Sequence, residues 1–400
     1  MVLADSKRPF EWFLAIRSLG LLADQIALLA IPVAIYMITE DVAWSGMAVM
    51  VQWLPRIIGL PFLGGWIDRW KLRSQYVAID AVRAAGAFVL IWIEQPILLM
   101  SMAGLLSLLN GYAFLVLEYS VATQLDKAQL ARNQSWLQVI ENTTRVAGPA
   151  AGGLLLAWGS IEGVMAMCTL LFALAAGMTL VRFPEQEARA KPDSVSGVIE
   201  SFRWIWASKP LTRLTVLTMG TNFIEGAVYA LLPGLILTQY GQGPDMVGYL
   251  NGGSALCVIV FMALITRWVS HWDLVWVGHL SLVMSSLLVV WMGLSPSFVA
   301  FCLLYTGFIV MRSLFVLYLR TERVKYIPTE NLGQVLGAMV AIILCTIPIS
   351  GGVVGVLANW LSMNQVLLLS VAGSMTIYVL AWWLTREHHT VKNVQNEPQD

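Results

Sequence analysis

Ionisable side chains lie inside several long apolar stretches of this 400-residue chain. A charged group at membrane depth is costly unless it is paired or hydrated, so each one is a candidate functional residue. Asp24 lies halfway along the first stretch, with Gln25 beside it and no cation close in sequence. A carboxylate in that position predicts either a group that exchanges protons or contacts a substrate, or a structural hydrogen bond.

Two further acids lie at membrane depth. Glu225 is halfway along the seventh stretch, with Asn222 three residues earlier on the same helical face. Glu141 and Arg145 are four residues apart in the fifth stretch, so a helix predicts a salt bridge between them. That pair is either a proton switch, in which protonation of Glu141 frees Arg145 for an anionic substrate, or a static structural pair.

Two arginines within apolar stretches, Arg56 and Arg312, have no acid partner close in sequence. Each could contact an anionic group on a substrate. The alternative is pairing across a helix bundle with Asp24, with Glu225 or with a backbone carbonyl.

Asn110 and Asn251 are weaker candidates for lining a cavity. No metal site is predicted, because the four cysteines form no C-x-x-C pair and the four histidines have no ligand spacing. The motifs G-x-S-x-G and H-E-x-x-H are absent, so an enzyme is not expected. The P-loop pattern is absent too, so any energy coupling comes from a gradient or from another chain.

The elements that must position these residues are membrane helices. A chain with 58% hydrophobic and 12% charged residues and a mean hydropathy of +0.73 is typical of the lipid bilayer. The 24 Lys and Arg balance the 24 Asp and Glu, so no basic field predicts binding to nucleic acid. Stretches long enough to span a bilayer lie at residues 10–38, 45–67, 74–93, 96–118, 131–158, 160–182, 212–238, 246–267, 273–293, 297–319, 330–358 and 364–385.

Positive charges indicate the orientation. Apart from the arginines inside the stretches, Lys and Arg lie at the termini, in loops after even-numbered stretches, or at stretch ends beside them. Because cytoplasmic loops retain Lys and Arg, both termini are predicted to be cytoplasmic. We expect an all-α integral membrane protein of the inner (cytoplasmic) membrane, with twelve transmembrane helices.

The longest polar break divides the stretches into two groups of six. Apolar residues at helical spacing from Val195 to Trp206 predict either an amphipathic helix at the membrane surface or a plain linker. The predicted layout is a cytoplasmic N-terminus (1–9), a six-helix half (10–182), a cytoplasmic linker (183–211), a second six-helix half (212–386) and a disordered cytoplasmic tail (387–400).

The two halves contain signs of a repeat. The pattern P-x-x-G-G occurs at Pro149 in the fifth stretch and at Pro348 in the eleventh, and the same offset places Asp24 close to Glu225. Matches at corresponding positions predict two pseudo-symmetric halves. Transporters built this way rock one half against the other around a substrate site between them.

A glycine-rich segment with alternating charges joins the second and third stretches. It reads Gly64-Gly65-Trp-Ile-Asp68-Arg69-Trp-Lys-Leu-Arg73. Asp68 can favour a neighbouring helix N-terminus, and Arg69 and Arg73 can pair with acids or lipid phosphates. The segment resembles the loop motif of the major facilitator superfamily, which implies a gate contact. It departs from the family pattern at Lys71, where Gly is common, and in the second half, where Arg267 replaces the acid.

The fifth stretch contains a second motif, Arg145-Val-Ala-Gly148-Pro149-Ala-Ala-Gly152-Gly153. It resembles the fifth-helix signature of the superfamily's drug and proton antiporters, which is associated with export. Glycines four residues apart permit close helix contact, and the proline kinks the helix. The alternative is generic packing of small residues.

Two further segments narrow the resemblance to one branch of the superfamily: Asp80-Ala-Val-Arg83-Ala and Ala131-Arg-Asn133. They look like the macrolide-efflux and enterobactin-exporter branch of the superfamily. We interpret Asp80 and Arg83 mainly as partners of the loop motif.

These features predict a proton-coupled secondary active exporter of a small amphipathic molecule. The mixture of acids and arginines at membrane depth slightly favours a siderophore-like secreted metabolite over a macrolide or multidrug efflux substrate. The further alternatives are an importer, a uniporter or a non-transporting membrane sensor. We expect no cofactor beyond the proton gradient, no nucleic-acid partner, contact with membrane lipid and a monomeric chain.

Overall fold

The computed structural model describes residues 7–39, 42–93, 95–124, 129–158, 161–183, 197–243 and 245–386. The first helices are α1 (Lys7–Thr39), α2 (Val42–Ile67), α3 (Leu72–Val89), α4 (Pro96–Gln124), α5 (Leu130–Trp158) and α6 (Ile161–Arg182). They are followed by α7 (Val198–Ala207), α8 (Lys209–Gly234), α9 (Asp245–Ile265), α10 (Leu274–Leu294), α11 (Phe298–Tyr326), α12 (Leu332–Leu357) and α13 (Met363–Arg386). Short helical turns adjoin them, namely η1 (Leu90–Trp92), η3 (Leu235–Gln239), η4 (Val269–His271) and η5 (Thr329–Asn331). Residues 1–6 of the predicted N-terminus, residues 184–196 of the predicted linker and the predicted tail 387–400 lie outside the described residues.

Each predicted apolar stretch coincides with one long helix. Within the described residues, ten helices are long and apolar enough to cross a membrane: α1, α3, α4, α6 and α8–α13. The helices α2 and α5 are of similar length, at 26 and 29 residues, but fall outside this set. Polar and charged residues, Glu141 and Arg145 among them, lower the hydropathy of α5.

Two helices continue further than their apolar stretches predict. The expected end of α4 is residue 118, and the helix runs to Gln124. The expected end of α11 is residue 319, and the helix runs to Tyr326. Polar residues of these extra turns are buried, among them Ser120 on α4 and Glu322 on α11. Hydropathy misses these turns because neighbouring helices shield their polar side chains.

The same pairs of helices pack together in both halves. In the first half α1 packs against α5 and α6, α2 against α4, and α3 against α6. In the second half α8 packs against α12 and α13, α9 against α11, and α10 against α13. This correspondence is the packing that a duplicated six-helix unit requires.

The short helix α7 connects the halves and packs against α8 and α12. It is amphipathic: Ser201 and Ile205 are buried, whereas Ile199, Trp204 and Trp206 are exposed. The amphipathic pattern predicted from Val195 onward is therefore present from Val198, and Val195 itself lies outside the described residues.

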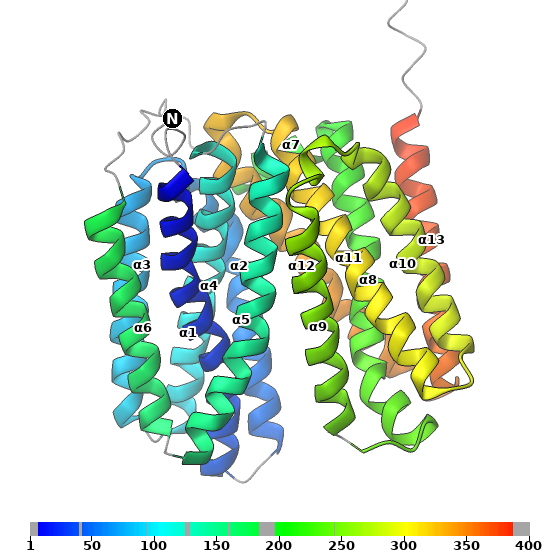
Figure 1. Ribbon diagram of the computed structural model, residues 1–400, viewed down its shortest axis with the longest axis horizontal. Helices are drawn as coiled ribbons and strands as arrows, with labels where there is room; N and C mark the ends of the chain where they lie inside the picture. Colours follow the sequence, from blue (N-terminus) through cyan, green and yellow to red (C-terminus); the bar gives the residue numbers. More distant parts are fainter. Residues whose placement is uncertain are drawn as a thin grey trace, which may run out of the picture.

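The two halves stand side by side, with α2 packed against α12 and α5 against α9 (Figure 1). The start of α1 and the end of α13 lie at the same end of the bundle, which we call the termini end (Figure 1). Since successive helices run in opposite directions, α2 ends and α12 begins there as well.

The buried core differs between the two ends of the bundle. One cluster draws on both halves, with Leu60 and Leu115 from the first and Leu317 and Leu336 from the second. The other two clusters are confined to single halves. Ile31, Leu99 and Met165 belong to the cluster of the first half, and Leu235, Phe301 and Val366 to that of the second. The halves therefore share a core toward the termini end and have separate cores toward the opposite end.

Candidate functional site

Between the halves, α2 and α12 cross at a contact lined by glycine. A Cβ atom on Gly64 would stand 2.5 Å from the carbonyl oxygen of Gly333. A Cβ atom on Gly337 would stand 2.5 Å from the carbonyl oxygen of Leu60. Because the obstructing atoms are backbone, only glycine allows this approach. We call this crossing, together with Asp68, the glycine latch.

Asp68 caps a helix of the opposite half. Its carboxylate accepts hydrogen bonds from the backbone N–H groups of Gly333 at 3.0 Å and Gln334 at 3.1 Å. Asn331, at the N-cap position of α12, provides no side-chain cap. A carboxylate at a helix N-terminus satisfies free N–H groups and the helix dipole. This is the contact expected of Asp68 from the sequence.

The remaining loop residues lie beside the latch. Gly65 faces the side chain of Gln334, and Arg69 is exposed. Arg73 donates to the carbonyl oxygen of Leu180 on α6, within its own half.

Four charged residues join the halves next to the latch, three of them buried and Glu141 nearly so. Arg320 of α11 forms a bidentate ion pair with Glu141 of α5, at 2.9 and 3.0 Å. Its Nε lies 3.0 Å from Glu118 of α4, which also pairs with Arg323. Two acids of the first half thus neutralise two arginines of the second. We call Glu118, Glu141, Arg320 and Arg323 the ion lock.

The predicted salt bridge between Glu141 and Arg145 is wrong for this conformation, because Glu141 pairs with Arg320. The sequence reasoning also missed Glu118, Arg320 and Arg323. It placed them at or beyond the ends of the fourth and tenth stretches, where charges are ordinary. Continuing the helix past residue 319 brings Arg320 and Arg323 onto one face, and that is the signal that could have found them.

A second charge cluster lies inside the first half, between α1 and α3. Arg17 is 2.9 Å from Asp80, Arg83 is 3.0 Å from Asp80, and Arg83 also pairs with Asp24. All four side chains are buried. Two acids balance two arginines, which lowers the cost of holding these charges in an apolar bundle. We call Arg17, Asp24, Asp80 and Arg83 the α1–α3 cluster.

The cluster supplies the partner of Asp24, since Arg83 reaches it from a separate helix. It corrects one interpretation, because Asp80 and Arg83 pair with α1 and not with the loop motif. The ring of Phe172 on α6 lies 4.2 Å from the Arg83 guanidinium carbon and closes the cluster on that side.

A third group of charged residues, drawn from both halves, lies midway along the bundle. Glu225 of α8 pairs with Arg312 of α11, and Tyr229 lies one turn further along α8. Arg145 of α5 is one turn from Glu141, on the face of that helix that contacts α11 of the other half. Arg145 is exposed, and Tyr229 is 39% exposed. We call Arg145, Glu225, Tyr229 and Arg312 the central site.

The acidic and basic residues of the central site lie at a common depth. With a rise of 1.5 Å per residue, Arg145, Glu225 and Arg312 lie about 21–24 Å along their helices from the termini end. That is beyond the ion lock and close to the middle of a bilayer core. The pairing of Arg312 with Glu225 is one of the two alternatives left open by the sequence.

For Arg56 of α2 the partner is a backbone carbonyl, which the sequence analysis also allowed. Its Nε donates to the carbonyl oxygen of Ser107 on α4 at 3.3 Å, and its guanidinium stacks on Trp53. Arg56 therefore tethers α2 to α4 within the first half.

Two of the three asparagine candidates have structural partners. Asn222 donates to the carbonyl oxygen of Ile343 at 3.0 Å, which joins α8 to α12. Asn251 accepts from the Tyr305 hydroxyl at 2.5 Å. Asn110 is half-buried on α4.

The glycines of the fifth-helix motif pack α5 onto α1. A Cβ atom on Gly148 would stand 2.3 Å from the Cβ of Gln25, and one on Gly152 would touch Ile26. Pro149 lies within the helix, and Gly153 has nothing within 4 Å of its Cβ position. The motif thus fixes the distance between two helices of the first half and places Gln25 against α5.

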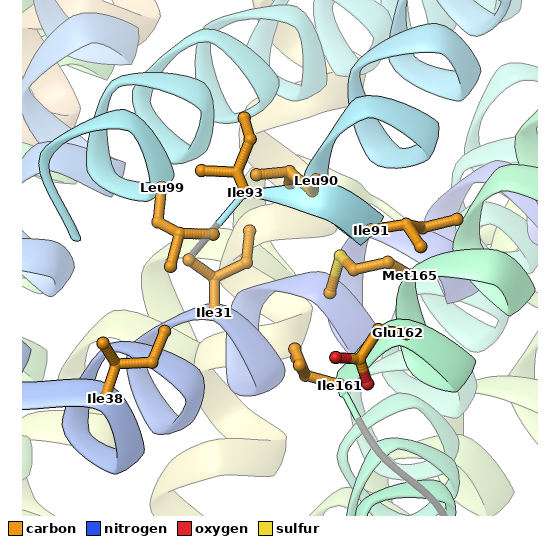
Figure 2. Close-up of a pocket in the computed structure, with 9 residues that line it drawn as sticks. All are labelled: Ile31, Ile38, Leu90, Ile91, Ile93, Leu99, Ile161, Glu162 and Met165. Atoms are coloured by element: carbon orange, nitrogen blue, oxygen red, sulfur yellow. The ribbon is translucent and has the colours of Figure 1, made fainter. Parts of the chain in front are cut away.

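A cavity of about 290 Å³ lies within the first half, away from the central site (Figure 2). Its walls are apolar apart from Glu162 at the start of α6; the others are Ile31, Ile38, Leu90, Ile91, Ile93, Leu99, Ile161 and Met165. Most of these residues lie toward the end opposite the termini. Among the described residues, no group of three or more His, Cys, Asp or Glu side chains could hold a metal ion.

The sequence matches the family model of the Major Facilitator Superfamily over residues 14–322. A comparison with curated proteins finds no match.

Similar folds occur among solved transporter structures. A bacterial homologue of the iron transporter ferroportin, in an outward-facing state, has a TM-score of 0.76 and 14% identity over 94% of this chain and 99% of that chain. The human organic anion transporter MFSD10 (TETRAN) has a TM-score of 0.78 and 14% identity over 94% and 100%. The transporter FucP, in its outward conformation, has a TM-score of 0.66 and 13% identity over 92% and 98%. At these identities the likeness concerns the fold alone.

Proposed function

This chain belongs to the major facilitator superfamily, and from that premise we propose that it is a proton-coupled secondary active exporter of a small amphipathic molecule. The family and the ten apolar helices identify a multi-pass membrane protein. We further propose twelve spans with both termini in the cytoplasm, in the inner membrane, from the placement of Lys and Arg. The proposed working unit is a monomer.

The single observation that supports an alternating-access mechanism is the difference in core packing between the two ends of the bundle. The halves share one apolar core toward the termini end and have separate cores at the other end. With cytoplasmic termini, this conformation is closed to the cytoplasm and faces outward. The polar contacts of the latch and the ion lock can break and reform, which a rocking motion of the halves requires.

Proton coupling is proposed for Asp24 and Glu225. Each is a buried carboxylate paired with one arginine, so a proton can replace the arginine when the helices shift. Glu225 is the better placed of the two. Its partner Arg312 is 20% exposed and its neighbour Tyr229 is exposed, whereas Asp24 is enclosed by α1, α3 and α6.

Export is proposed from the fifth-helix motif. Gly148 and Gly152 hold α5 against α1, and α5 also carries Glu141 of the ion lock and Arg145 of the central site. A single helix thus links the lock to the site. The proposed cargo is a siderophore-like secreted metabolite, with a macrolide-like or other drug as the alternative of the same mechanism.

The pairing of Glu225 with Arg312 favours one second candidate, a proton-coupled importer. A proton on Glu225 would free Arg312 for an anionic group, so proton and cargo would bind together and move in the same direction. In the exporter, cargo and proton must exclude each other at the same site.

The first experiment compares the culture medium of parent and deletion strains by mass spectrometry, under iron limitation and in rich medium. We expect one secreted metabolite to disappear from the medium and to accumulate in the cells. That metabolite is then tested in inverted vesicles with an acidic interior, where an antiporting exporter takes it up. An unchanged medium, together with no protection against a panel of toxic compounds, would contradict export.

A further inference from the structure

Arg145 differs from the other arginines in the interior of the bundle. Arg17, Arg83 and Arg312 each pair with an acid within their own half, and Arg320 pairs across the halves. Arg56 donates to a backbone carbonyl. Among the described residues Arg145 has no acid partner, although it lies in the middle of an apolar helix bundle.

The surroundings of Arg145 are open to a ligand. Its side chain is exposed, on the face of α5 where Glu141, one turn away, contacts Arg320 of the opposite half. Tyr229 of α8, one turn from Glu225, is 39% exposed. With a rise of 1.5 Å per residue, Arg145 is about 22 Å along α5 from the termini end, below the layer of lipid headgroups.

The charge at this place is positive. Arg145 and Arg312 contribute two cations, and Glu225 contributes one anion that is already bound to Arg312. An unpaired guanidinium in a site with few waters binds carboxylate, phosphate, sulfate or phenolate groups through two parallel hydrogen bonds.

The neighbour of Arg145 on its own helix is the acid of the ion lock. Glu141 is one turn away on the same face of α5, a spacing that allows an ion pair. In this conformation Arg320 holds Glu141 through two hydrogen bonds at 2.9 and 3.0 Å. When the lock opens, Arg320 moves away with the second half, and Arg145 is the nearest cation left on α5.

We propose that Arg145 binds an anionic group of the cargo, and that Glu141 switches it off by pairing with Arg145 when the ion lock opens. The inference rests on the proposed transport function and names the charge class of the cargo. With cytoplasmic termini the switch weakens the anion site when it opens to the cytoplasm, so it fits the importer, the second candidate above, better than the exporter. With the lock closed, Arg145 is available to an anion; with the lock open, Glu141 competes for it.

The test measures local charge and needs no knowledge of the cargo. Cys257, Cys302 and Cys345 are changed to alanine and a single cysteine is introduced by Tyr229→Cys. Purified protein in nanodiscs is then treated with an anionic or a cationic methanethiosulfonate reagent, and the ratio of the two rates is recorded. We expect the anionic reagent to be favoured, and Arg145→Gln to lower the ratio about ten-fold, as loss of one nearby charge requires.

A control cysteine at Val299, an exposed residue at the start of α11, should show no change with Arg145→Gln. An unchanged ratio at position 229, or no reaction with either reagent, overturns the anion site. A chain that transports nothing would contradict the proposed function but would leave this ratio as it is.

The switch is tested in the same background. Arg320→Gln releases Glu141, so the ratio should fall toward that of Arg145→Gln. Adding Glu141→Gln should restore it, because the competing carboxylate is gone. Glu141→Gln alone should leave the ratio unchanged. If Arg320→Gln gives the ratio of the parent in protein that remains monodisperse, the switch is overturned.

Discussion

Glu141 of α5 and Arg320 of α11 form a bidentate ion pair across the two halves, at 2.9 and 3.0 Å. Both belong to helices that also carry residues of the central site, Arg145 on α5 and Arg312 on α11. One bond between the halves is therefore connected, through two rigid helices, to the place where we expect cargo to bind.

Arg320→Gln should open the termini end. The change leaves Glu118 and Glu141 without this partner, and breaking a buried ion pair costs about 3–5 kcal/mol, a cost relieved when water reaches the acids. Trp70 and Tyr326 are exposed residues of opposite halves. Spin labels on cysteines at these two positions report the distance between the halves by pulsed electron paramagnetic resonance. We expect longer distances. Arg69→Gln, which removes an exposed arginine at the same end, is the control and should keep the parent distances.

Asp68→Asn should weaken the glycine latch without unfolding the chain. Loss of the charge at the start of α12 removes about 1 kcal/mol, so the closed conformation should lose about five-fold in population. The same labels report it. Asp273→Asn is a matched control, because Asp273 caps α10 within its own half by accepting from Val275 and Trp276. If both variants shift the distances equally, Asp68 stabilises only a helix and not the latch.

Gly337→Ala should prevent closure at the termini end. The added Cβ would stand 2.5 Å from the carbonyl oxygen of Leu60, and a backbone atom cannot move aside without separating α2 from α12. Gly177→Ala adds the same methyl group to α6 where nothing lies within 4 Å, so it should be neutral. Cysteine accessibility from the termini end distinguishes them: rising labelling is expected for Gly337→Ala alone. Parent-like labelling in both variants would show that the crossing of α2 and α12 can accommodate an added methyl group.

Asp80→Asn should destabilise the first half. Asp80 is fully buried and pairs with both Arg17 and Arg83, so the neutral side chain leaves an excess cation in an apolar bundle. We expect a loss of about 3 kcal/mol, measured as a lower thermal midpoint in detergent. Glu200→Gln, on the exposed face of α7, should leave the midpoint unchanged. A parent-like midpoint for Asp80→Asn would mean that the cluster tolerates a net charge.

The sequence predicts the helices well because apolar length is a local property. It predicts the contact of Asp68 for a similar reason, since a carboxylate at the glycine-rich end of a helix can reach the N-terminus of a neighbouring helix. The pairing of charges is different. Asp24 with Arg83 and Glu141 with Arg320 are joined only by the packing of separate helices, which no local pattern encodes. The polar turns beyond residue 319 also depend on packing that no local pattern encodes, because residues of the opposite half cover them.

Glu225→Gln should abolish coupling to the proton gradient while leaving the fold intact. The amide keeps the shape of the carboxylate but cannot exchange a proton, and Arg312 loses its partner and stays free. In inverted vesicles with an acidic interior, the parent exporter should accumulate the cargo found in the medium, and the variant should only equilibrate it. Glu330→Gln, an exposed acid at η5, is the control and should accumulate cargo as the parent does. Asp24→Asn is measured beside them. If Asp24→Asn abolishes accumulation and Glu225→Gln does not, the proton travels on the α1–α3 cluster and not through the central site.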